Sequence, residues 1–342
     1  MNHLSSRIAQ SGRTIIELLI AMTIGLVIVI GVSALYLSSS GISRTANQIS
    51  TTEQAAQLAL LIIGDSLKIA GYAEIIGSDF AGQGQTLMDG THLRGCTGAQ
   101  FNNPFPAYAT PPAPPTPPDL TCGIASGGDA VYVRYQAAPV VAVMPAVDVA
   151  RNTLNDCGAS TVNQNQVLAS AQLRAGAGIV RPIVTNVFQL DAVNNNLDCA
   201  GYGAATFQTL LQNVLEFRVF YRFDDVAQTL GASGVTNAVP FGGSIRSASD
   251  INSIVVPPGS IDPWNYVVAA IVCVTVQTDE GGVSTSPTNT TASRCPLTPA
   301  EAESGLNLTT LLPTTDGRIR RTFSQVFTVR ARATPTPSIL GP

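Results

Sequence analysis

The chain has few of the side chains on which enzyme active sites depend. Its 342 residues include two histidines, His3 and His92, and one tryptophan, and only 12% of the residues are charged. It contains no Cys-x-x-Cys pair, no Gly-x-Ser-x-Gly sequence and no Walker sequence. These absences argue against a histidine-dependent triad, a multi-histidine zinc centre, a thioredoxin-like motif and a nucleotide-hydrolysing site. We therefore expect neither an enzyme nor a metal or cofactor site.

The other candidates for chemistry give weak signals. Asp224 and Asp225 are not followed by the Asp-x-Asp-x-Asp-Gly pattern of a calcium loop, so we interpret them as a solvated strand end. His92 is interpreted as a surface-loop residue. A pair of catalytic carboxylates from distant positions stays open, which keeps a signal-anchored periplasmic enzyme as an alternative. The formal net charge is −4 and the lysines and arginines are scattered, so no direct nucleic-acid site is evident.

What the chain does have is one long apolar stretch near its start. No charged residue occurs between Glu17 and Arg44. As a helix, this stretch exceeds the roughly 20 residues that are needed to cross a bilayer. Glu17 lies at its edge, where a carboxylate without a partner costs on the order of 3 kcal/mol. The sequence therefore predicts a membrane-spanning helix whose single acid requires a positively charged partner.

Three interpretations of this stretch compete. A cleaved secretory signal would use the small residues Ser38, Ser39 and Ser40, but the apolar run is too long and Glu17 is out of place for such a signal. A plain signal anchor fits the length and leaves Glu17 unexplained. The third interpretation accounts for Glu17 and rests on a resemblance.

Gly12, Arg13, Thr14-Ile15-Ile16 and Glu17-Leu18 together resemble the class III leader of type IV pilins and pseudopilins. The resemblance implies that a prepilin peptidase cleaves after Gly12 and N-methylates Arg13 as the new first residue. It also implies that Glu17 neutralises the N-terminal amine of a neighbouring subunit, which would set the register of the assembly. The family usually has Phe, Met or Leu where this chain has Arg13.

The apolar pattern continues beyond the membrane-spanning stretch. Apolar residues at spacings of three, four and seven form one helical face: Ile49, Ala56, Leu60, Ile63, Leu67 and Ala70. Gly71 suits the left-handed position that ends a helix. We predict one helix from Thr14 to about Ala70, about 85 Å long. The predicted parts are a leader (1–12), a membrane or filament-core helix (13–43), its amphipathic continuation (44–72) and a periplasmic β-rich domain (73–342).

The six cysteines all follow the apolar stretch, where an oxidising compartment would permit disulfides. Sequence alone allows many pairings. We favour the sequential set because each bond then closes a moderate loop rich in turn residues: Cys96 with Cys122, Cys157 with Cys199, and Cys273 with Cys295. Each bond could contribute about 3 kcal/mol by restricting the unfolded chain. Reduced thiols buried in the core are the alternative.

A Pro-rich loop, residues 104–118, lies between Cys96 and Cys122. Its run Pro111-Pro112-Ala113-Pro114-Pro115 favours extended polyproline geometry and cannot join the interior of a sheet. We interpret the loop as a variable insertion. A stapled surface loop that contacts a partner is the alternative.

Strand signals dominate after Cys122. Residues 215–223 alternate between apolar and mostly polar side chains, which predicts an antiparallel strand with one buried face and one mostly solvent-exposed face. Further strands are predicted at 130–135, 322–333 and 266–277, the last of them central because it is apolar on both faces. Pro182 interrupts residues 179–190, which predicts an edge strand. Thr298-Pro299-Ala300-Glu301 has the form of a capping box that begins a short helix.

With these elements the resemblance narrows to the PilW family of minor pilins, which is related to the J-type minor pseudopilin of type II secretion. It is carried by the leader, the helix end Lys68-Ile69-Ala70-Gly71-Tyr72, the strand 214–224 and the segment Arg320-Arg321-Thr322-Phe323. The resemblance implies a pilin-like α+β fold, in which a long N-terminal helix packs on an antiparallel β-sheet domain.

The same resemblance implies a minor pilin that helps to initiate type IV pilus assembly and lies at or near the pilus tip. The implied partners are the prepilin peptidase, the other minor pilins, the major pilin and a tip adhesin. Before assembly the protein would span the inner membrane with its globular part in the periplasm, and afterwards it would belong to the pilus fibre on the cell surface. A minor pseudopilin of a type II secretion system is the alternative.

Overall fold

The computed structural model of the protein describes residues 14–72, 75–76, 85–86, 91–105, 118–136, 140–141, 157, 179–180, 183–201, 206–224, 243–255, 262–279, 291–304, 309–311 and 318–329. The chain divides into two compact units, Met1–Ser50 and Thr51–Pro342. The predicted leader, residue Arg13 and most of the Pro-rich loop lie outside the described residues.

A single helix, α1 (Ile15–Lys68), forms the first described element. Its last turns bury the apolar face predicted from the sequence, and the residues of this face that are fully covered are Ala56, Leu60, Ile63, Leu67 and Ala70. Gly71 follows with φ of +75° and donates its N–H to the carbonyl of Arg134 at 2.9 Å. The predicted long helix and its glycine end are therefore confirmed.

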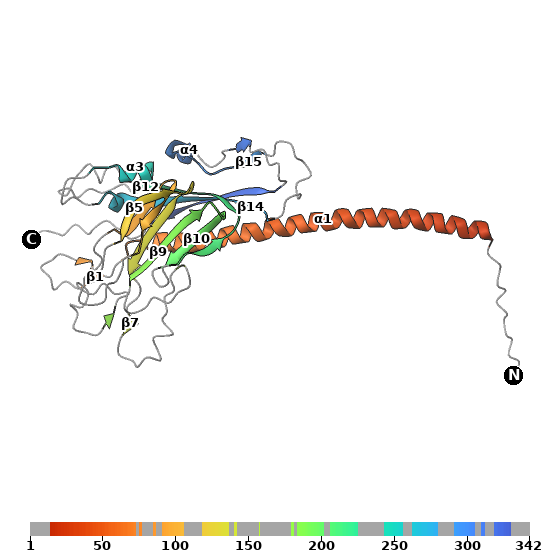
Figure 1. Ribbon diagram of the computed structural model, residues 1–342, viewed down its shortest axis with the longest axis horizontal. Coiled ribbons are helices and arrows are strands. Elements are labelled where there is room, and N and C mark those ends of the chain that lie inside the picture. The colour runs from red at the N-terminus through yellow and green to blue at the C-terminus, as the bar shows by residue number, and fades with distance from the viewer. Residues whose placement is uncertain are drawn as a thin grey trace, which may run out of the picture. The chain divides into compact units, whose positions relative to one another are not determined.

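Two antiparallel sheets follow (Figure 1). The five-stranded sheet has the order β11-β10-β9-β6-β3, with β3 (Leu93–Cys96), β6 (Ala130–Gln136), β9 (Ile183–Asp191), β10 (Asn196–Gly201) and β11 (Gln208–Leu211). The four-stranded sheet has the order β13-β12-β14-β17, with β12 (Val214–Phe223), β13 (Ser244–Ser247), β14 (Val267–Gln277) and β17 (Arg320–Thr328). The predicted α+β architecture, a long N-terminal helix with antiparallel sheets, is confirmed.

Shorter elements complete the described chain. Four two-stranded pairs are β1 (Ile75–Ile76) with β2 (Gln85–Thr86), β4 (Ala99–Asn103) with β5 (Asp119–Ala125), β7 (Val140–Val141) with β8 (Ile179–Val180), and β15 (Thr291–Ser293) with β16 (Thr309–Leu311). The short helices are α3 (Ala248–Asn252), η4 (Pro263–Tyr266) and α4 (Pro299–Ser304). The predicted short helix is α4, where the hydroxyl of Thr298 accepts from the N–H of Glu301 at 3.3 Å.

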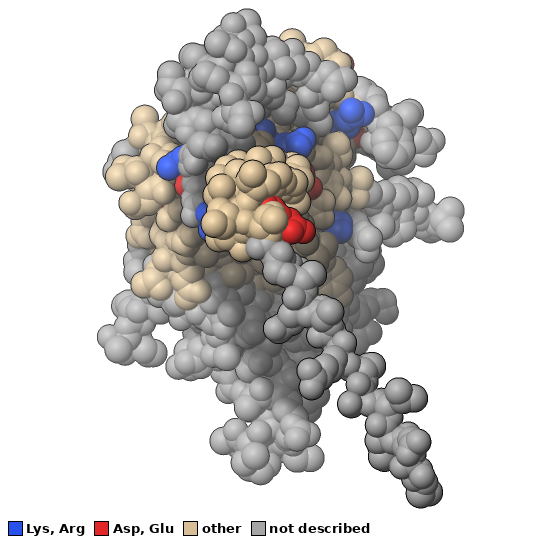
Figure 2. Space-filling model, turned by 90° about the vertical axis from the view of Figure 1, so that its right-hand side faces the viewer, with Lys and Arg blue, Asp and Glu red and all other residues tan. Residues whose placement is uncertain are grey.

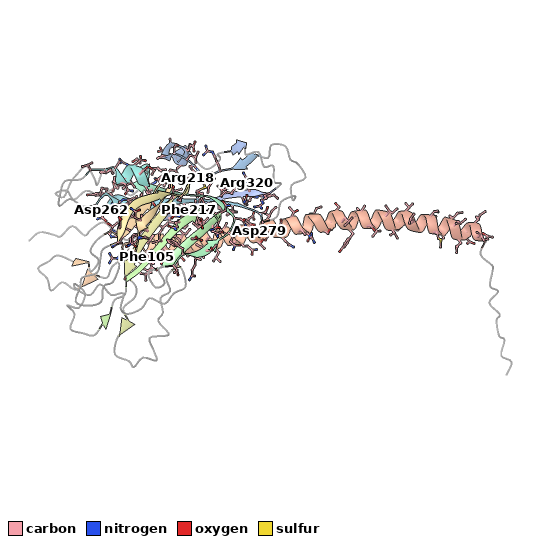
Figure 3. All side chains as sticks on the ribbon, viewed as in Figure 1. Phe105, Phe217, Arg218, Asp262, Asp279 and Arg320 are labelled. Atoms are coloured by element: carbon pink, nitrogen blue, oxygen red, sulfur yellow. A yellow bond between two sulfur atoms is a disulfide. The ribbon has the colours of Figure 1, made fainter. Side chains whose placement is uncertain are left out.

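One hydrophobic cluster joins the second half of α1 to both sheets. It contains Phe188 of β9 and Phe217 of β12, each fully buried (Phe217 is labelled in Figure 3). Gly64 lets α1 approach β17 closely, because a Cβ atom at Gly64 would lie 2.1 Å from the ring of Phe327. Across the cluster, the Asn186 amide donates to the hydroxyl of Ser66 at 3.1 Å. Burial and this polar contact together fix the helix on the sheets.

The prediction of an edge strand at residues 179–190 is wrong. Strand β9 begins only at Ile183, directly after Pro182, and it pairs with β10 on one side and β6 on the other. A proline before the first residue of a strand removes no ladder hydrogen bond, so it does not confine that strand to an edge. The preceding pair Ile179–Val180 belongs to another, two-stranded sheet as β8.

Two smaller predictions also fail. His92 does not belong to a surface loop: it directly precedes β3, is only 9% exposed, and packs against Gly71 at the end of α1. The second face of β12 is only partly exposed to solvent. Phe220 is buried there, the charged residues of this face are half-buried, and the Glu216 carboxylate accepts from the N–H of Cys295 at 2.9 Å.

The start of α4 offers a test of pH dependence. The Glu301 carboxylate accepts two hydrogen bonds from Arg294, both at 2.9 Å, and one from the N–H of Leu297 at 2.8 Å. These bonds lower the pKa of Glu301 from 4.5 to about 2, and the bonds from Arg294 have the largest effect. The folded state favours the ionised carboxylate of Glu301. The stability that its hydrogen bonds contribute is therefore fully present above pH 4.5 and is lost as the pH falls toward 2.

We therefore expect the stability difference between the wild type and Glu301→Gln to shrink as the pH falls from about 4.5 to about 2. Thermal unfolding of both proteins across this pH range measures the difference. A difference that stays constant through the range would contradict the assignment of the bonds to an ionised Glu301.

Candidate functional site

The first part of α1 exposes an apolar surface. The large apolar side chains between Ile15 and Leu37 are all more than half exposed in the described structure. By length and composition, α1 is the one described helix that could cross a membrane. Figure 2 views this helix from its N-terminal side, and the end that faces the viewer is tan, the colour of uncharged side chains, apart from a red acidic group. Residues 15–43 of this helix therefore have the length and composition of a membrane-spanning segment and contain one acidic residue, Glu17.

The acid, Glu17, lies in the first turn of α1, and its backbone is held by Thr14. The hydroxyl of Thr14 accepts from the N–H of Glu17 at 3.4 Å, and the Thr14 carbonyl accepts from Leu18 at 3.3 Å. Thr14 thus caps the helix, and the Thr-x-x-Glu spacing is that of a capping box. A carboxylate in the first turn is also favoured by the helix dipole. The Thr-x-x-Glu spacing is a signal that can be read directly from the sequence.

Two hydroxyl groups within the apolar run donate hydrogen bonds inside the helix. Thr23 donates to the carbonyl of Ile20 at 2.9 Å, and Ser40 donates to that of Leu37 at 2.9 Å. Such bonds remove the cost of placing a hydroxyl in an apolar environment. Glu17 is therefore the group in this run whose charge calls for a partner from outside the helix.

Other predicted site residues are placed as follows. Gly12 and Arg13 lie outside the described residues, as does Asp225, while Asp224 directly follows the end of β12. Among the described residues, no group of three or more His, Cys, Asp or Glu side chains could hold a metal ion.

The six cysteines form disulfides in the sequential pairing. The bonds join Cys96 to Cys122, Cys157 to Cys199, and Cys273 to Cys295, with Cα–Cα distances of 5.6, 6.1 and 5.7 Å. These are the three pairs expected from the sequence. The last bond ties β14, at the centre of its sheet, to the segment between β15 and α4.

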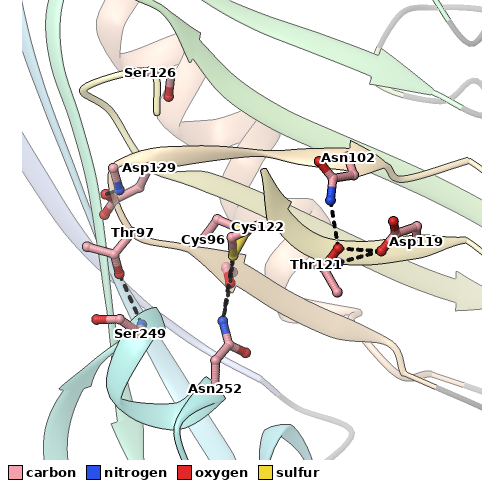
Figure 4. Close-up of a disulfide and its surroundings, with 12 residues drawn as sticks. Cys96, Thr97, Asn102, Asp119, Thr121, Cys122, Ser126, Asp129, Ser249 and Asn252 are labelled. Atoms are coloured by element: carbon pink, nitrogen blue, oxygen red, sulfur yellow. Dashed lines mark hydrogen bonds between the residues drawn. A yellow bond between two sulfur atoms is a disulfide. The ribbon is translucent and has the colours of Figure 1, made fainter. Parts of the chain in front are cut away.

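The Pro-rich loop connects the strands of the β4–β5 hairpin, which the first disulfide holds against β3 (Figure 4). At the hairpin, the Thr121 side chain donates to Asp119 at 2.5 Å and accepts from Asn102 at 2.8 Å. On the other side, the Asn252 amide of α3 lies 3.8 Å from the sulfur of Cys122. The structure therefore fixes the base of the loop firmly, while residues 106–117 lie outside the described part.

No family model matches the chain, and no curated protein sequence matches it. Among solved structures, the chain is similar to the type IV-like pilin TTHA1219 from Thermus thermophilus, with 13% sequence identity and a TM-score of 0.35. The match covers 82% of this chain and 98% of that chain.

Proposed function

We propose that the protein is a minor pilin of the PilW type, a structural subunit and not an enzyme, which helps to initiate type IV pilus assembly at or near the tip. The observation that carries the proposal is the position of Glu17: it is the single charge in the exposed apolar part of α1, residues 15–43, and it lies at the capped N-terminal end of the helix. The leader sequence around Gly12, resembling that of prepilins, supports the same role.

The proposed mechanism begins in the inner membrane. A prepilin peptidase cleaves after Gly12, so that the new amine and the Glu17 carboxylate lie about one helical turn apart in sequence. Apolar helices gain little hydrophobic energy when they leave lipid for a bundle, so side-chain packing and charge pairing decide their association. Glu17 then pairs with the amine of a neighbouring subunit, in a low-dielectric core where the attraction is much stronger than in water.

The proposed partners follow from this mechanism. They are the peptidase, the major pilin, the other minor pilins and a tip adhesin, and the globular part would face the periplasm before assembly. A minor pseudopilin of type II secretion would use the same anchor and the same acid. Deletion of the gene separates the two, because loss of surface pili supports the pilus and loss of exported enzymes with normal pili supports secretion.

Leader removal gives the first test. We expect Gly12→Leu to block cleavage, so that the full chain keeps residues 1–12, because the residue before the cut must be small to fit the peptidase. Intact mass of the purified protein from cells that express a prepilin peptidase measures this. Gly25→Leu is the matched control, since a Cβ atom there meets nothing within 4 Å, and its product should begin at Arg13. A wild-type product that begins near Gly41 would contradict the proposal and indicate conventional secretion.

A further inference from the structure

Oxygen-bearing side chains gather on one face of the hairpin that β9 and β10 form. In its ladder Asp191 lies opposite Asn196, and Gln189 lies opposite Asp198. On the other side of β10, Thr209 of β11 lies opposite Asp198. Residues two apart in a strand, and residues directly opposite each other, share a face of the sheet. The residues between them in the strands belong to the main hydrophobic cluster, so the polar group lies on the face turned away from that cluster.

One carboxylate oxygen of this group is buried without a partner. The Oδ1 atom of Asp198 has no hydrogen bond in the structure and no access to solvent. Burial raises the pKa of Asp198, a hydrogen bond with Thr209 lowers it, and the charge of Asp191 raises it. The two carboxylates therefore lie close enough to repel each other. An unsatisfied buried acceptor is costly, so the Asp198 oxygen calls for a positive partner.

Gln189 is a second polar group without a partner at this place. Its residue is only 7% exposed, and no hydrogen-bond partner of its side chain lies within the part of the chain that the structure describes. A buried amide is costly unless it is hydrogen-bonded. Although Gln189 lies directly opposite Asp198, the two side chains are not joined. Each therefore keeps an oxygen for a third group between them.

Asp191 and Asn196 supply further oxygens at the closed end of the hairpin. The Asp191 carboxylate accepts from the N–H groups of Val193 at 3.0 Å and Asn194 at 3.3 Å, and from the Asn194 amide at 2.6 Å. These bonds fix its orientation. The Asn196 amide donates to the hydroxyl of Thr209 at 3.4 Å, which leaves the carbonyl oxygen of Asn196 as an acceptor. Since Asp191 is half-buried, the group is open to solvent on one side.

The chemistry of these donors favours calcium. Two carboxylates and two amide carbonyls are hard oxygen ligands, and calcium accepts such a mixture in flexible geometry with water in the remaining positions. Zinc and copper prefer nitrogen and sulfur donors, which the group lacks. With only two acids, the site differs from a cluster of three or more ionisable ligands, which is absent among the described residues.

We propose that this end of the β9–β10 hairpin binds one calcium ion through the carboxylates of Asp191 and Asp198 and the side-chain oxygens of Gln189 and Asn196. The ion would bridge the two strands and neutralise the repulsion between the two carboxylates. The site lies in the globular unit, and the proposal does not depend on leader cleavage or on the Glu17 pairing.

Thermal unfolding of the full chain in detergent tests the proposal. Extracellular calcium modules bind with dissociation constants of about 0.1 to 1 mM, so calcium is added at about 10 mM. We expect the unfolding midpoint to rise by about 2 to 5 °C over that in EDTA. Magnesium at the same concentration should raise it by less than about 1 °C, because magnesium gives up its water reluctantly. No rise with calcium, or an equal rise with magnesium, would overturn the proposal.

Substitutions locate the ion. Asp198→Asn keeps the shape of the side chain and should abolish the calcium shift. In EDTA this variant should unfold at the wild-type midpoint or above it, because a buried charge without a partner is gone. Gln189→Leu removes one oxygen from a buried position and should weaken calcium binding by about tenfold. A full calcium shift in Asp198→Asn would overturn the proposal.

Asp119→Asn is the matched control. Like Asp191, Asp119 accepts from the N–H two residues later, that of Thr121 at 3.0 Å, but it belongs to β5 and lies outside the hairpin. Its variant should keep the full calcium shift. Loss of the shift in this variant as well would indicate a general effect of surface charge and would contradict a site on β9 and β10.

Discussion

Asp129→Ala is expected to lower the free energy of unfolding by about 3 kcal/mol, because it removes a buried charge that other groups need. The carboxylate is 3% exposed and accepts from Gly98 N–H at 2.9 Å, Val219 N–H at 2.8 Å and the Arg218 guanidinium at 3.1 Å. Burial raises the pKa of Asp129, against the lowering effect of these donors. Alanine would leave three donors without an acceptor.

The effect should be large because these contacts cross between sheets. Asp129 directly precedes β6 of the five-stranded sheet, whereas Arg218 and Val219 belong to β12 of the four-stranded sheet. Thermal unfolding of the full chain in detergent should show a midpoint lower by roughly 5 to 10 °C. The control is Asp65→Ala, which removes an exposed ion pair with Lys68 and should change stability by less than about 1 kcal/mol. Equal stability of the two variants would contradict the assigned role of Asp129.

The parts of the fold that sequence predicted are those that local patterns determine. The apolar spacing from Ala56 to Ala70 and the glycine at position 71 specify α1 and its end, because both act within a few turns of helix. Alternation over residues 215–223 and the continuous apolar run of β14 specify their strands for the same reason. Glu17 could be singled out because a lone charge in an apolar run needs no tertiary structure to be recognised.

The features that could not be predicted from the sequence depend on which segments, far apart in the chain, come into contact in the fold. Pro182 restricts its own position only, so it could not show that β9 would have neighbours on both sides. Asp129 and Arg218 lie 89 positions apart, and a Gly-Gly-Asp sequence before a strand indicates only a turn. The close approach of Gly64 in α1 to Phe327 in β17 likewise joins positions more than 250 apart in the chain. Strand order and sheet contacts decide these features.

Glu17→Gln is expected to lower incorporation of the protein into pili by at least about tenfold while leaving its membrane insertion intact. Glutamine keeps the shape of the side chain and removes the charge on which the proposed pairing with a neighbouring amine depends. An amine left unpaired in an apolar core would cost about 3 kcal/mol, which corresponds to a hundredfold change in an equilibrium constant. Immunoblots of sheared pili and of the membrane fraction measure incorporation and insertion separately.

Two variants separate the charge of Glu17 from other properties of α1. Glu17→Asp keeps the charge on a shorter side chain and should restore part of the incorporation, which a purely steric role of Glu17 would not allow. Glu53→Gln removes the other glutamate of α1, which lies beyond the apolar run and 3.9 Å from Arg321. This variant should be incorporated as well as the wild type. Normal incorporation of Glu17→Gln would exclude the pairing mechanism, and with it the reason why a helix otherwise suited to lipid keeps one acid at its capped end.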